Sequence, residues 1–168
     1  MMYFLDWKPE TASAGDLVHP PRLLPPVSEL LEGQNRTMRS GFWRERWSLV
    51  YITQSCDTVC QHDLYNMRQL HVSLYKDAMR LQRVLITSQT DINALQTRYP
   101  ELHIIHGPAQ RVTELAMLFS WQNDNPLQVN SIYLVDPLGH LVMRFSDKLA
   151  FRDIRRDLVR LLRYAWSG

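Results

Sequence analysis

Apolar residues follow two periods along this chain, and together they predict alternating strands and helices. Between residues 47 and 53 the run WSLVYIT is apolar, aromatic and β-branched, which predicts a buried strand. After it, apolar residues recur every three or four positions, which predicts a helix with one buried stripe. The stripe consists of Leu64, Met67, Leu70, Leu74 and Ala78. Residues 81–87 then return to the pattern of a core strand.

The alternation continues toward the carboxyl end. Residues 90–99 predict a short helix, residues 102–105 a strand and residues 109–121 a third helix. Residues 131–145 predict a β-hairpin, because two apolar runs flank Asp-Pro-Leu-Gly, with proline and glycine at the second and fourth turn positions. A last amphipathic helix carries one apolar row, formed by Ile154, Leu158, Leu161, Leu162 and Ala165.

Residues 1–40 predict an irregular lead-in to a domain that spans residues 41–168. Prolines and glycines are frequent in the lead-in and no period is sustained, so we expect extended or turn backbone and one short helical turn at 27–33. The opening stretch MMYFLDW lacks the charged region and cleavage site of a complete signal peptide. Two interpretations stay open: the remnant of a removed membrane anchor, or a natural amino terminus whose aromatic residues pack on the domain.

The predicted order of elements is β, α, β, α, β, α, β, β, α. Alternation followed by a hairpin and a helix predicts a mixed sheet covered by helices on both faces. The fold class is therefore α/β, and the order resembles the thioredoxin-like three-layer fold, a central mixed β-sheet flanked by helices, with a terminal β-hairpin plus helix. In open α/β sheets, functional groups gather at the carboxyl ends of strands.

Composition and charge exclude several classes of protein. At 168 residues the chain can bury one core without a disulfide, and its 45% hydrophobic and 21% charged residues are typical of a globular domain. The net charge of +2 and the dispersed arginines do not indicate a nucleic-acid partner. Apolar runs are shorter than the roughly 20 residues that cross a bilayer. Membrane contact is therefore expected only if MMYFLDW is the remnant of a removed anchor.

The arginines of the last predicted helix have a simple interpretation as its solvated side. Asp153 and Asp157 interrupt their positive charge, and the apolar row opposite has the spacing of a helix packed on its own sheet. We therefore favour core packing over contact with anionic lipid as the role of this helix.

The only two cysteines, Cys56 and Cys60, lie where the first predicted core strand passes into its helix. Residues four apart on a helix have Cα atoms roughly 6 Å from each other, within the range of a disulfide. The helix amino terminus favours a thiolate at Cys56, whereas the neighbouring Asp57 opposes a second negative charge. The pair is a candidate for redox or metal chemistry; the alternative is a stabilising disulfide or two inert buried thiols.

The sequence YITQSCDTVCQHDL resembles the strand, loop and Cys-x-x-x-Cys helix start of the Sco family of copper-handling cytochrome oxidase assembly proteins. IYLVDPLGHLVMRF resembles the late hairpin of that family. The resemblance implies a membrane-anchored protein on the periplasmic face of a bacterial inner membrane. It also implies that Cys56 and Cys60 are catalytic or copper-binding thiols, whose partner is a respiratory oxidase subunit or another thiol or copper protein.

This chain departs from the family pattern at three positions. The family usually places prolines after both cysteines, where this chain has Asp57 and Gln61, and a histidine ligand where this chain has Gln128. Copper(I) favours thiolates with imidazole as a common third donor, so the loss of that histidine weakens the metal hypothesis. His62 and His140 are the candidate replacements, and the candidate metal ligands are the two cysteines with His140.

Two further hypotheses compete with thiol or copper chemistry. The missing prolines and the missing histidine favour a non-catalytic thioredoxin-like scaffold that binds a respiratory-complex partner. A peroxidase is indicated by Thr53, because Thr-x-x-Cys resembles the motif of peroxiredoxins. The proline usual before that threonine is Leu49 here, so a β-forming role explains Thr53 better.

Overall fold

The computed structural model describes residues 13–34 and 36–164, which are organised around an eight-stranded sheet of order β1-β8-β7-β4-β5-β6-β2-β3. Three central strands run parallel: β4 (Trp47–Thr53), β5 (Leu81–Thr87) and β6 (His103–His106). The predicted core strands are thereby confirmed, and the sheet is mixed, because its remaining pairs are antiparallel.

The predicted hairpin is also confirmed. Its strands are β7 (Ile132–Val135) and β8 (His140–Phe145), and β7 pairs antiparallel with β4. The Asp136 side chain accepts hydrogen bonds from the backbone N–H groups of Leu138 and His140, at 2.9 and 2.8 Å. This aspartate therefore holds the turn closed, as expected for the first residue of such a turn.

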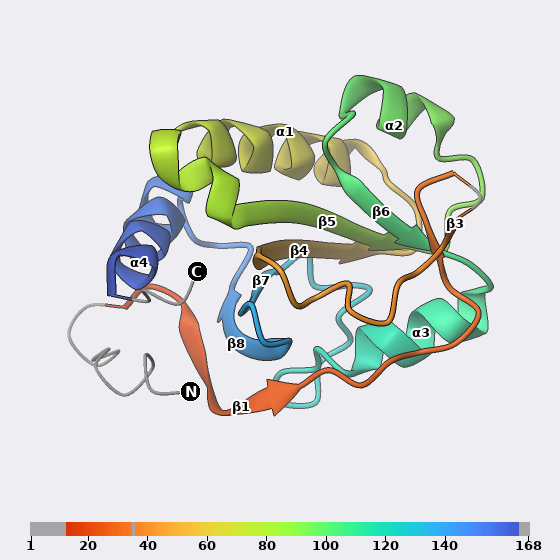
Figure 1. Ribbon diagram of the computed structural model, residues 1–168, viewed down its shortest axis with the longest axis horizontal. Helices are drawn as coiled ribbons and strands as arrows, with labels where there is room; N and C mark the ends of the chain where they lie inside the picture. Colours follow the sequence, from red (N-terminus) through yellow and green to blue (C-terminus); the bar gives the residue numbers. More distant parts are fainter. Residues whose placement is uncertain (1–12, 35, 165–168) are drawn as a thin grey trace.

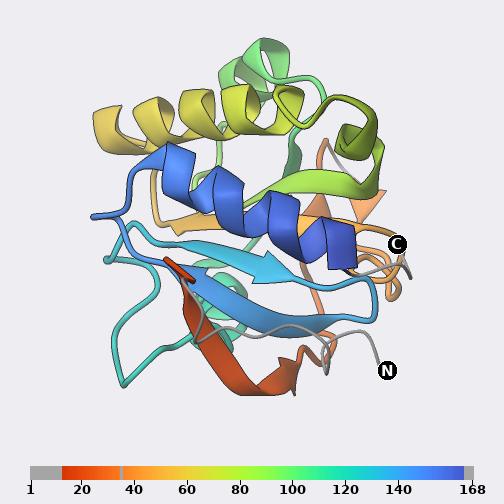
Figure 2. The same ribbon diagram turned by 90° about the vertical axis from the view of Figure 1, so that its left-hand side faces the viewer.

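Helices cover both faces of the sheet, which makes three layers (Figure 1). One face carries α1 (Thr58–Val72), α2 (Asn93–Arg98) and α4 (Phe151–Tyr164), and the other carries α3 (Ala109–Met117). Figure 2 shows α4 lying beside α1 on the same side of the sheet. The α/β class and the flanking helices are as predicted.

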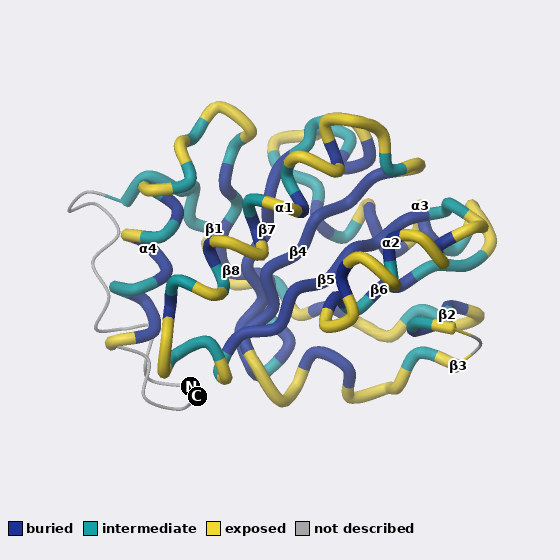
Figure 3. The backbone as a smooth tube through the Cα atoms, turned by 90° about the horizontal axis from the view of Figure 1, so that it is seen from above, coloured by how far each residue is buried: buried dark blue, intermediate teal, exposed yellow. Residues whose placement is uncertain are grey.

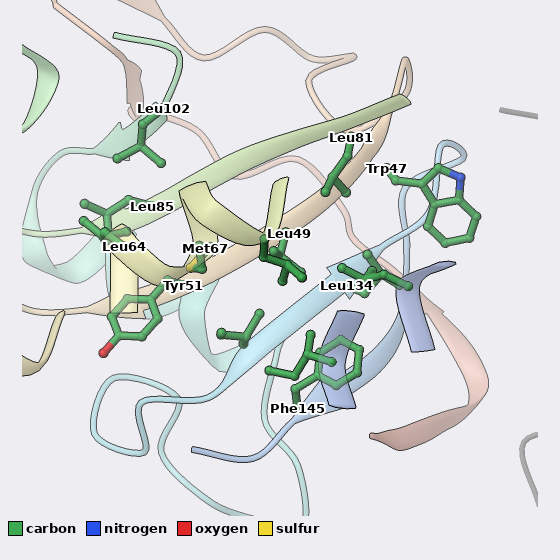
Figure 4. Packing of buried hydrophobic residues seen from close by; sticks show 14 of the residues in the cluster. Trp47, Leu49, Tyr51, Leu64, Met67, Leu81, Leu85, Leu102, Leu134 and Phe145 are labelled. Atoms are coloured by element: carbon green, nitrogen blue, oxygen red, sulfur yellow. The ribbon is translucent and has the colours of Figure 1, made fainter. Parts of the chain in front are cut away.

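Side chains of β4 alternate between two cores. Trp47, Leu49 and Tyr51 pack in the core under α1 and α4, whereas Val50 and Ile52 pack in the core under α3. Because both faces are covered, every residue of β4 is buried (Figure 3), and the strand is mostly apolar along its whole length. Figure 4 shows the first core, where Tyr51 lies at the margin with its hydroxyl oxygen beyond the aliphatic side chains.

The helical stripe predicted after the cysteines is divided into two elements. Helix α1 ends at Val72 and is followed by a 3-10 helix, η2 (Tyr75–Arg80). The break occurs because Tyr75 adopts a positive φ of 52°, which is incompatible with a continuous α-helix. Leu74 is nevertheless buried. The apolar spacing therefore predicted the burial of this residue correctly, but it did not predict that α1 ends at Val72.

Three strands come from the segment expected to be irregular, and for them that expectation is wrong. They are β1 (Asp16–Leu23), β2 (Leu31–Glu32) and β3 (Arg36–Thr37), and β2 replaces part of the predicted helical turn. β1 includes Pro20 and Pro21, which an edge strand tolerates because half of its N–H groups need no partner in the sheet. The division at residue 40 stays a prediction, and MMYFLDW lies outside the described residues.

Candidate functional site

The two cysteines form a disulfide at the carboxyl end of β4, with their Cα atoms 5.1 Å apart. Cys56 lies in the loop after the strand, and Cys60 lies in the first turn of α1. Cys60 is completely buried in the core under α1, whereas Cys56 is half-buried at the margin of that core. An external thiol can therefore reach Cys56 far more readily than Cys60.

Asp57 begins the helix that carries the second cysteine. Its backbone is extended (φ −86°, ψ −168°), and its side-chain oxygen accepts a hydrogen bond from the Cys60 N–H at 3.0 Å. This is the geometry of an N-cap, and it places a carboxylate at the positive end of the helix dipole. The negative charge of Asp57 therefore weakens the electrostatic stabilisation that the amino terminus of the helix offers to a thiolate.

The cysteine loop is tied to the end of the neighbouring strand β5. The Gln89 Oε1 accepts a hydrogen bond from the Cys56 N–H at 2.8 Å, and its Nε2 donates to the Asp91 carbonyl at 2.7 Å. The Thr87 hydroxyl donates to the Gln54 carbonyl at 3.0 Å. Gln89 is absent from the sequence-based site, because nothing local in the sequence links it to a cysteine 33 residues away.

Thr53, the last residue of β4, contributes to the shape of the same loop. Its hydroxyl donates a hydrogen bond to the Ser55 carbonyl at 3.0 Å, and its side chain is largely buried. The hydroxyl therefore supports the turn that leads to Cys56, in keeping with a strand-forming and structural role.

A polar cluster lies beside α1 near the disulfide, formed by Tyr51, Asp63 and Asn130. The Tyr51 hydroxyl donates a hydrogen bond to Asn130 Oδ1 at 2.9 Å. Burial raises the pKa of the Asp63 carboxyl, and the neighbouring Tyr51 hydroxyl opposes that rise. Burial, reinforced by the negative charge of Asp63, also raises the pKa of the Tyr51 phenol. A cavity of about 20 Å³, lined in part by Asp63 and Asn130, is large enough for one water molecule.

Asp63 could have been found from the sequence, whereas Asn130 could not. Asp63 follows Cys60 by three residues, and this spacing places both residues on one face of the helix. Asn130 reaches the site only through the antiparallel pairing of β7 with β4, which is a property of the folded sheet.

His140 lies at the opposite end of the sheet from the disulfide. Val135, at the end of β7, pairs with Ser48 near the start of β4, and the turn between Val135 and His140 therefore lies near that start. Cys56 follows the other end of β4. His140 Nδ1 is instead 3.4 Å from Asp136 Oδ2, within its own turn. The structure thus brings the two cysteines together without His140.

The remaining candidate donors do not complete a metal site. His62 is exposed on α1, where its Nε2 lies 3.0 Å from Asn66 Nδ2, and Gln128 is exposed and offers no imidazole. Over residues 13–34 and 36–164, no group of three or more His, Cys, Asp or Glu side chains is placed to hold a metal ion. A site of two thiolates and an imidazole, which suits copper(I), is therefore not matched by the residues present.

Comparisons with solved structures identify the fold as thioredoxin-like and similar to that of Sco proteins. Yeast Sco1 with copper bound superposes with a TM-score of 0.69 at 17% identity, over 83% of this chain and 92% of that chain. A SCO1/SenC family lipoprotein from Bacillus anthracis gives 0.63 at 16% identity, over 86% and 98%. BsSco, described through its disulfide switch as a Sco-family cytochrome c oxidase assembly protein, gives 0.63 at 15% identity, over 88% and 98%.

These likenesses confirm the predicted fold and its similarity to Sco proteins. No curated protein matches the sequence significantly. No helix in the described part of the chain is long and apolar enough to span a bilayer. The family model described as "Transmembrane-like, thioredoxin-like, C-terminal domain" matches residues 47–165, which include both cysteines and both predicted motif stretches. The chain therefore belongs to this transmembrane-like, thioredoxin-like C-terminal domain family.

Proposed function

We propose that this protein performs thiol–disulfide exchange through Cys56 and Cys60 during assembly of a respiratory cytochrome oxidase. One observation carries the proposal: a disulfide at the carboxyl end of a central strand, with one cysteine half-buried and the other enclosed. The solved structures of similar fold include Sco proteins, one of which is described through a disulfide switch. The partner is an oxidase subunit or another thiol or copper protein.

The exchange proceeds by two displacements. A thiolate of the partner attacks the Cys56 sulfur, the bond to Cys60 breaks, and Cys60 leaves as a thiolate that takes up a proton. A second partner thiolate then attacks the partner's sulfur in the mixed disulfide and releases Cys56. The partner dithiol is thereby oxidised to a disulfide by two electrons, and the Cys56–Cys60 pair is reduced to a dithiol. The same steps in reverse reduce a partner disulfide.

The positions of the two sulfurs assign different roles to them. Cys56 forms the mixed disulfide because it lies in the loop that a partner can reach, and Cys60 acts as the leaving or resolving sulfur. The first turn of α1 stabilises a departing Cys60 thiolate through its unpaired N–H groups, and Asp57 reduces that stabilisation. Exposed Val59, between the two cysteines, offers apolar surface to a partner.

The proposed location is the periplasmic face of a bacterial inner membrane, with the domain held by an anchor. Support comes from the lipoprotein among the similar structures and from the transmembrane-like name of the family. Copper enters this proposal through the partner, because the donor set around the two cysteines does not suit a resident copper ion.

A redox titration tests the proposed function. Equilibrated in glutathione or dithiothreitol buffers, the protein should show a reversible two-electron couple within the range of cellular thiol couples, about −120 to −300 mV. Cys56→Ser should abolish the couple, and the matched variant Ser55→Ala should keep it, because Ser55 is the exposed neighbour of Cys56. A potential well below about −300 mV would contradict an exchange role.

A redox-silent scaffold is the second candidate, and the complete burial of Cys60 favours it. A disulfide with one sulfur in the core can act as a staple between the cysteine loop and α1. The double variant Cys56→Ser/Cys60→Ser separates the two functions. A scaffold without its disulfide still binds and supports the oxidase partner, whereas an exchange factor loses that support.

A further inference from the structure

The cysteine loop, residues 54–56, lies beside a second loop that comes from the neighbouring strand. Thr53 pairs with Thr87 at the ends of the parallel strands β4 and β5, so the segments that follow these strands leave the sheet side by side (Figure 1). We call the end of β5 and the loop after it, residues 87–91, the clamp segment. The sheet itself therefore fixes the position of the clamp segment relative to Cys56.

Hydrogen bonds from the clamp segment hold the cysteine loop at two of its three residues. At the start of the loop, the hydroxyls of Thr87 and Ser88 both donate to the Gln54 carbonyl, at 3.0 and 3.1 Å. At its end, the Gln89 Oε1 accepts the Cys56 N–H at 2.8 Å. Gln89 is thus the side chain of the clamp segment that binds a cysteine directly.

The Gln89 side chain is itself held in the orientation that this contact needs. Its Nε2 donates to the Asp91 carbonyl at 2.7 Å, and its backbone N–H donates to the Thr87 hydroxyl oxygen at 3.1 Å. A reversed amide would place Oε1 against the Asp91 carbonyl and Nε2 against the Cys56 N–H, so both hydrogen bonds would be lost. The side chain is also half-buried, which limits its contact with water.

These contacts do not depend on the disulfide, because the atoms that they join are oxygen and nitrogen atoms. The clamp segment fixes the backbone of Cys56, and the first turn of α1 with its Asp57 cap fixes Cys60. After reduction, both cysteines are therefore still held close to the Cα separation of 5.1 Å that the disulfide shows. The tendency of a dithiol to close rises with the effective concentration of one thiol at the other, which is high when both are held in place.

We propose that Gln89 is a positioning residue that sets the reduction potential of the Cys56–Cys60 pair. It holds Cys56 beside Cys60 in the dithiol, raises the effective concentration of the two thiols and so stabilises the disulfide against reduction. Without Gln89 the cysteine loop gains freedom in the dithiol, but gains little in the disulfide, where the S–S bond still holds Cys56. Loss of Gln89 therefore makes the pair a stronger oxidant. This inference rests on the proposed exchange, in which the potential decides the direction of electron flow.

The test compares the full 168-residue chain with its variants Gln89→Ala and Gln96→Ala. Gln96 is the matched control, because it is also half-buried and its Nε2 donates to the carbonyls of Tyr99 and Leu102 instead of to the clamp segment. Equilibration in dithiothreitol or glutathione buffers measures each potential. Gln89→Ala should lower the effective concentration about fivefold, the factor of one neutral hydrogen bond, and so raise the potential by about 20 mV. Gln96→Ala should match the parent.

A second measurement separates positioning from a general loss of stability. At fixed glutathione concentrations, mass spectrometry gives the ratio of the glutathione mixed disulfide at Cys56 to the Cys56–Cys60 disulfide, which should rise about fivefold in Gln89→Ala. The inference is overturned if Gln89→Ala keeps or lowers the parent potential, or if Gln96→Ala shifts it equally. A parent potential well below about −300 mV would contradict the proposed exchange, and the shift in Gln89→Ala would still be measured.

Discussion

The Asp57 carboxylate accepts a hydrogen bond from the N–H of Cys60 at 3.0 Å, so the residue next to one cysteine caps the helix that carries the other. The cap orders the first turn of α1 and thereby the position of the buried sulfur. Its negative charge also opposes a thiolate at either cysteine. The Asp57 side chain thus stabilises the helix that holds the site and lowers the reactivity of the two thiols.

Replacing Asp57 separates these two effects. Asp57→Asn keeps the N-cap oxygen and removes the charge, so the pKa of the Cys56 thiol in the reduced protein should fall. Asp57→Ala removes both and should also lower the free energy of unfolding by about 1 kcal/mol. The ultraviolet absorbance of the thiolate during a pH titration measures the pKa. An unchanged or raised Cys56 pKa in Asp57→Asn would contradict this account.

The two cysteines should differ in their effect on stability. Loss of the disulfide through Cys56→Ser should lower the free energy of unfolding by about 2 kcal/mol, as expected for so short a loop. Cys60→Ser should cost about 1 to 3 kcal/mol more, because it leaves a hydroxyl in a fully buried position. Urea denaturation of each variant, with the reduced parent as control, measures both values. Equal losses would show that Cys60 is not enclosed as described.

Asp63 should make stability depend on pH in the acid range. Because burial raises its pKa in the folded protein, the folded state binds the proton more tightly than the unfolded chain does, whose aspartate pKa is about 3.9. The contribution of Asp63 therefore becomes less favourable as pH rises from about 3.9 through the folded pKa. Asp63→Asn should be more stable than the parent at neutral pH, and the difference should shrink toward low pH. A difference that is constant with pH would refute the assignment.

His140 should make no contribution to copper binding. It lies at the end of the sheet opposite the disulfide, so the reduced protein should bind Cu(I) no better than a simple dithiol peptide does, measured against a competing chelator. His140→Ala should leave that affinity unchanged, whereas Cys56→Ser should lower it. Tight binding that is lost in His140→Ala would require a sheet arrangement different from the one described.

Local patterns predicted the elements that local interactions define. The run that became β4, the helix after it and the hairpin around Asp136 each carry their own periodicity or turn residues, and all three were predicted. β1 carries no such signal, because its order comes from pairing with β8, more than a hundred residues away. Its two prolines also argued against a strand until its place at the sheet edge was known.

The candidate site shows the same division between local and distant information. The cysteines and Asp57 were found because they are neighbours in sequence at a strand-to-helix junction. Gln89 and Asn130 were missed, since the sheet brings them to the junction from other strands. His140 was proposed as a ligand because a sequence does not reveal to which end of a sheet a hairpin turn points. Asp157 was assigned to the solvated side of its helix for a similar reason, although it is buried.

The prolines of β1 have a consequence for how copies of this protein behave in concentrated solution. Among residues 13–34 and 36–164, β1 is the last strand on its side of the sheet, and Pro20 and Pro21 lack the N–H groups that another molecule needs to extend the ladder there. At the other border β3 is only two residues long. Neither border is therefore a good template for intermolecular strand addition, which protects a strand-rich domain from aggregation.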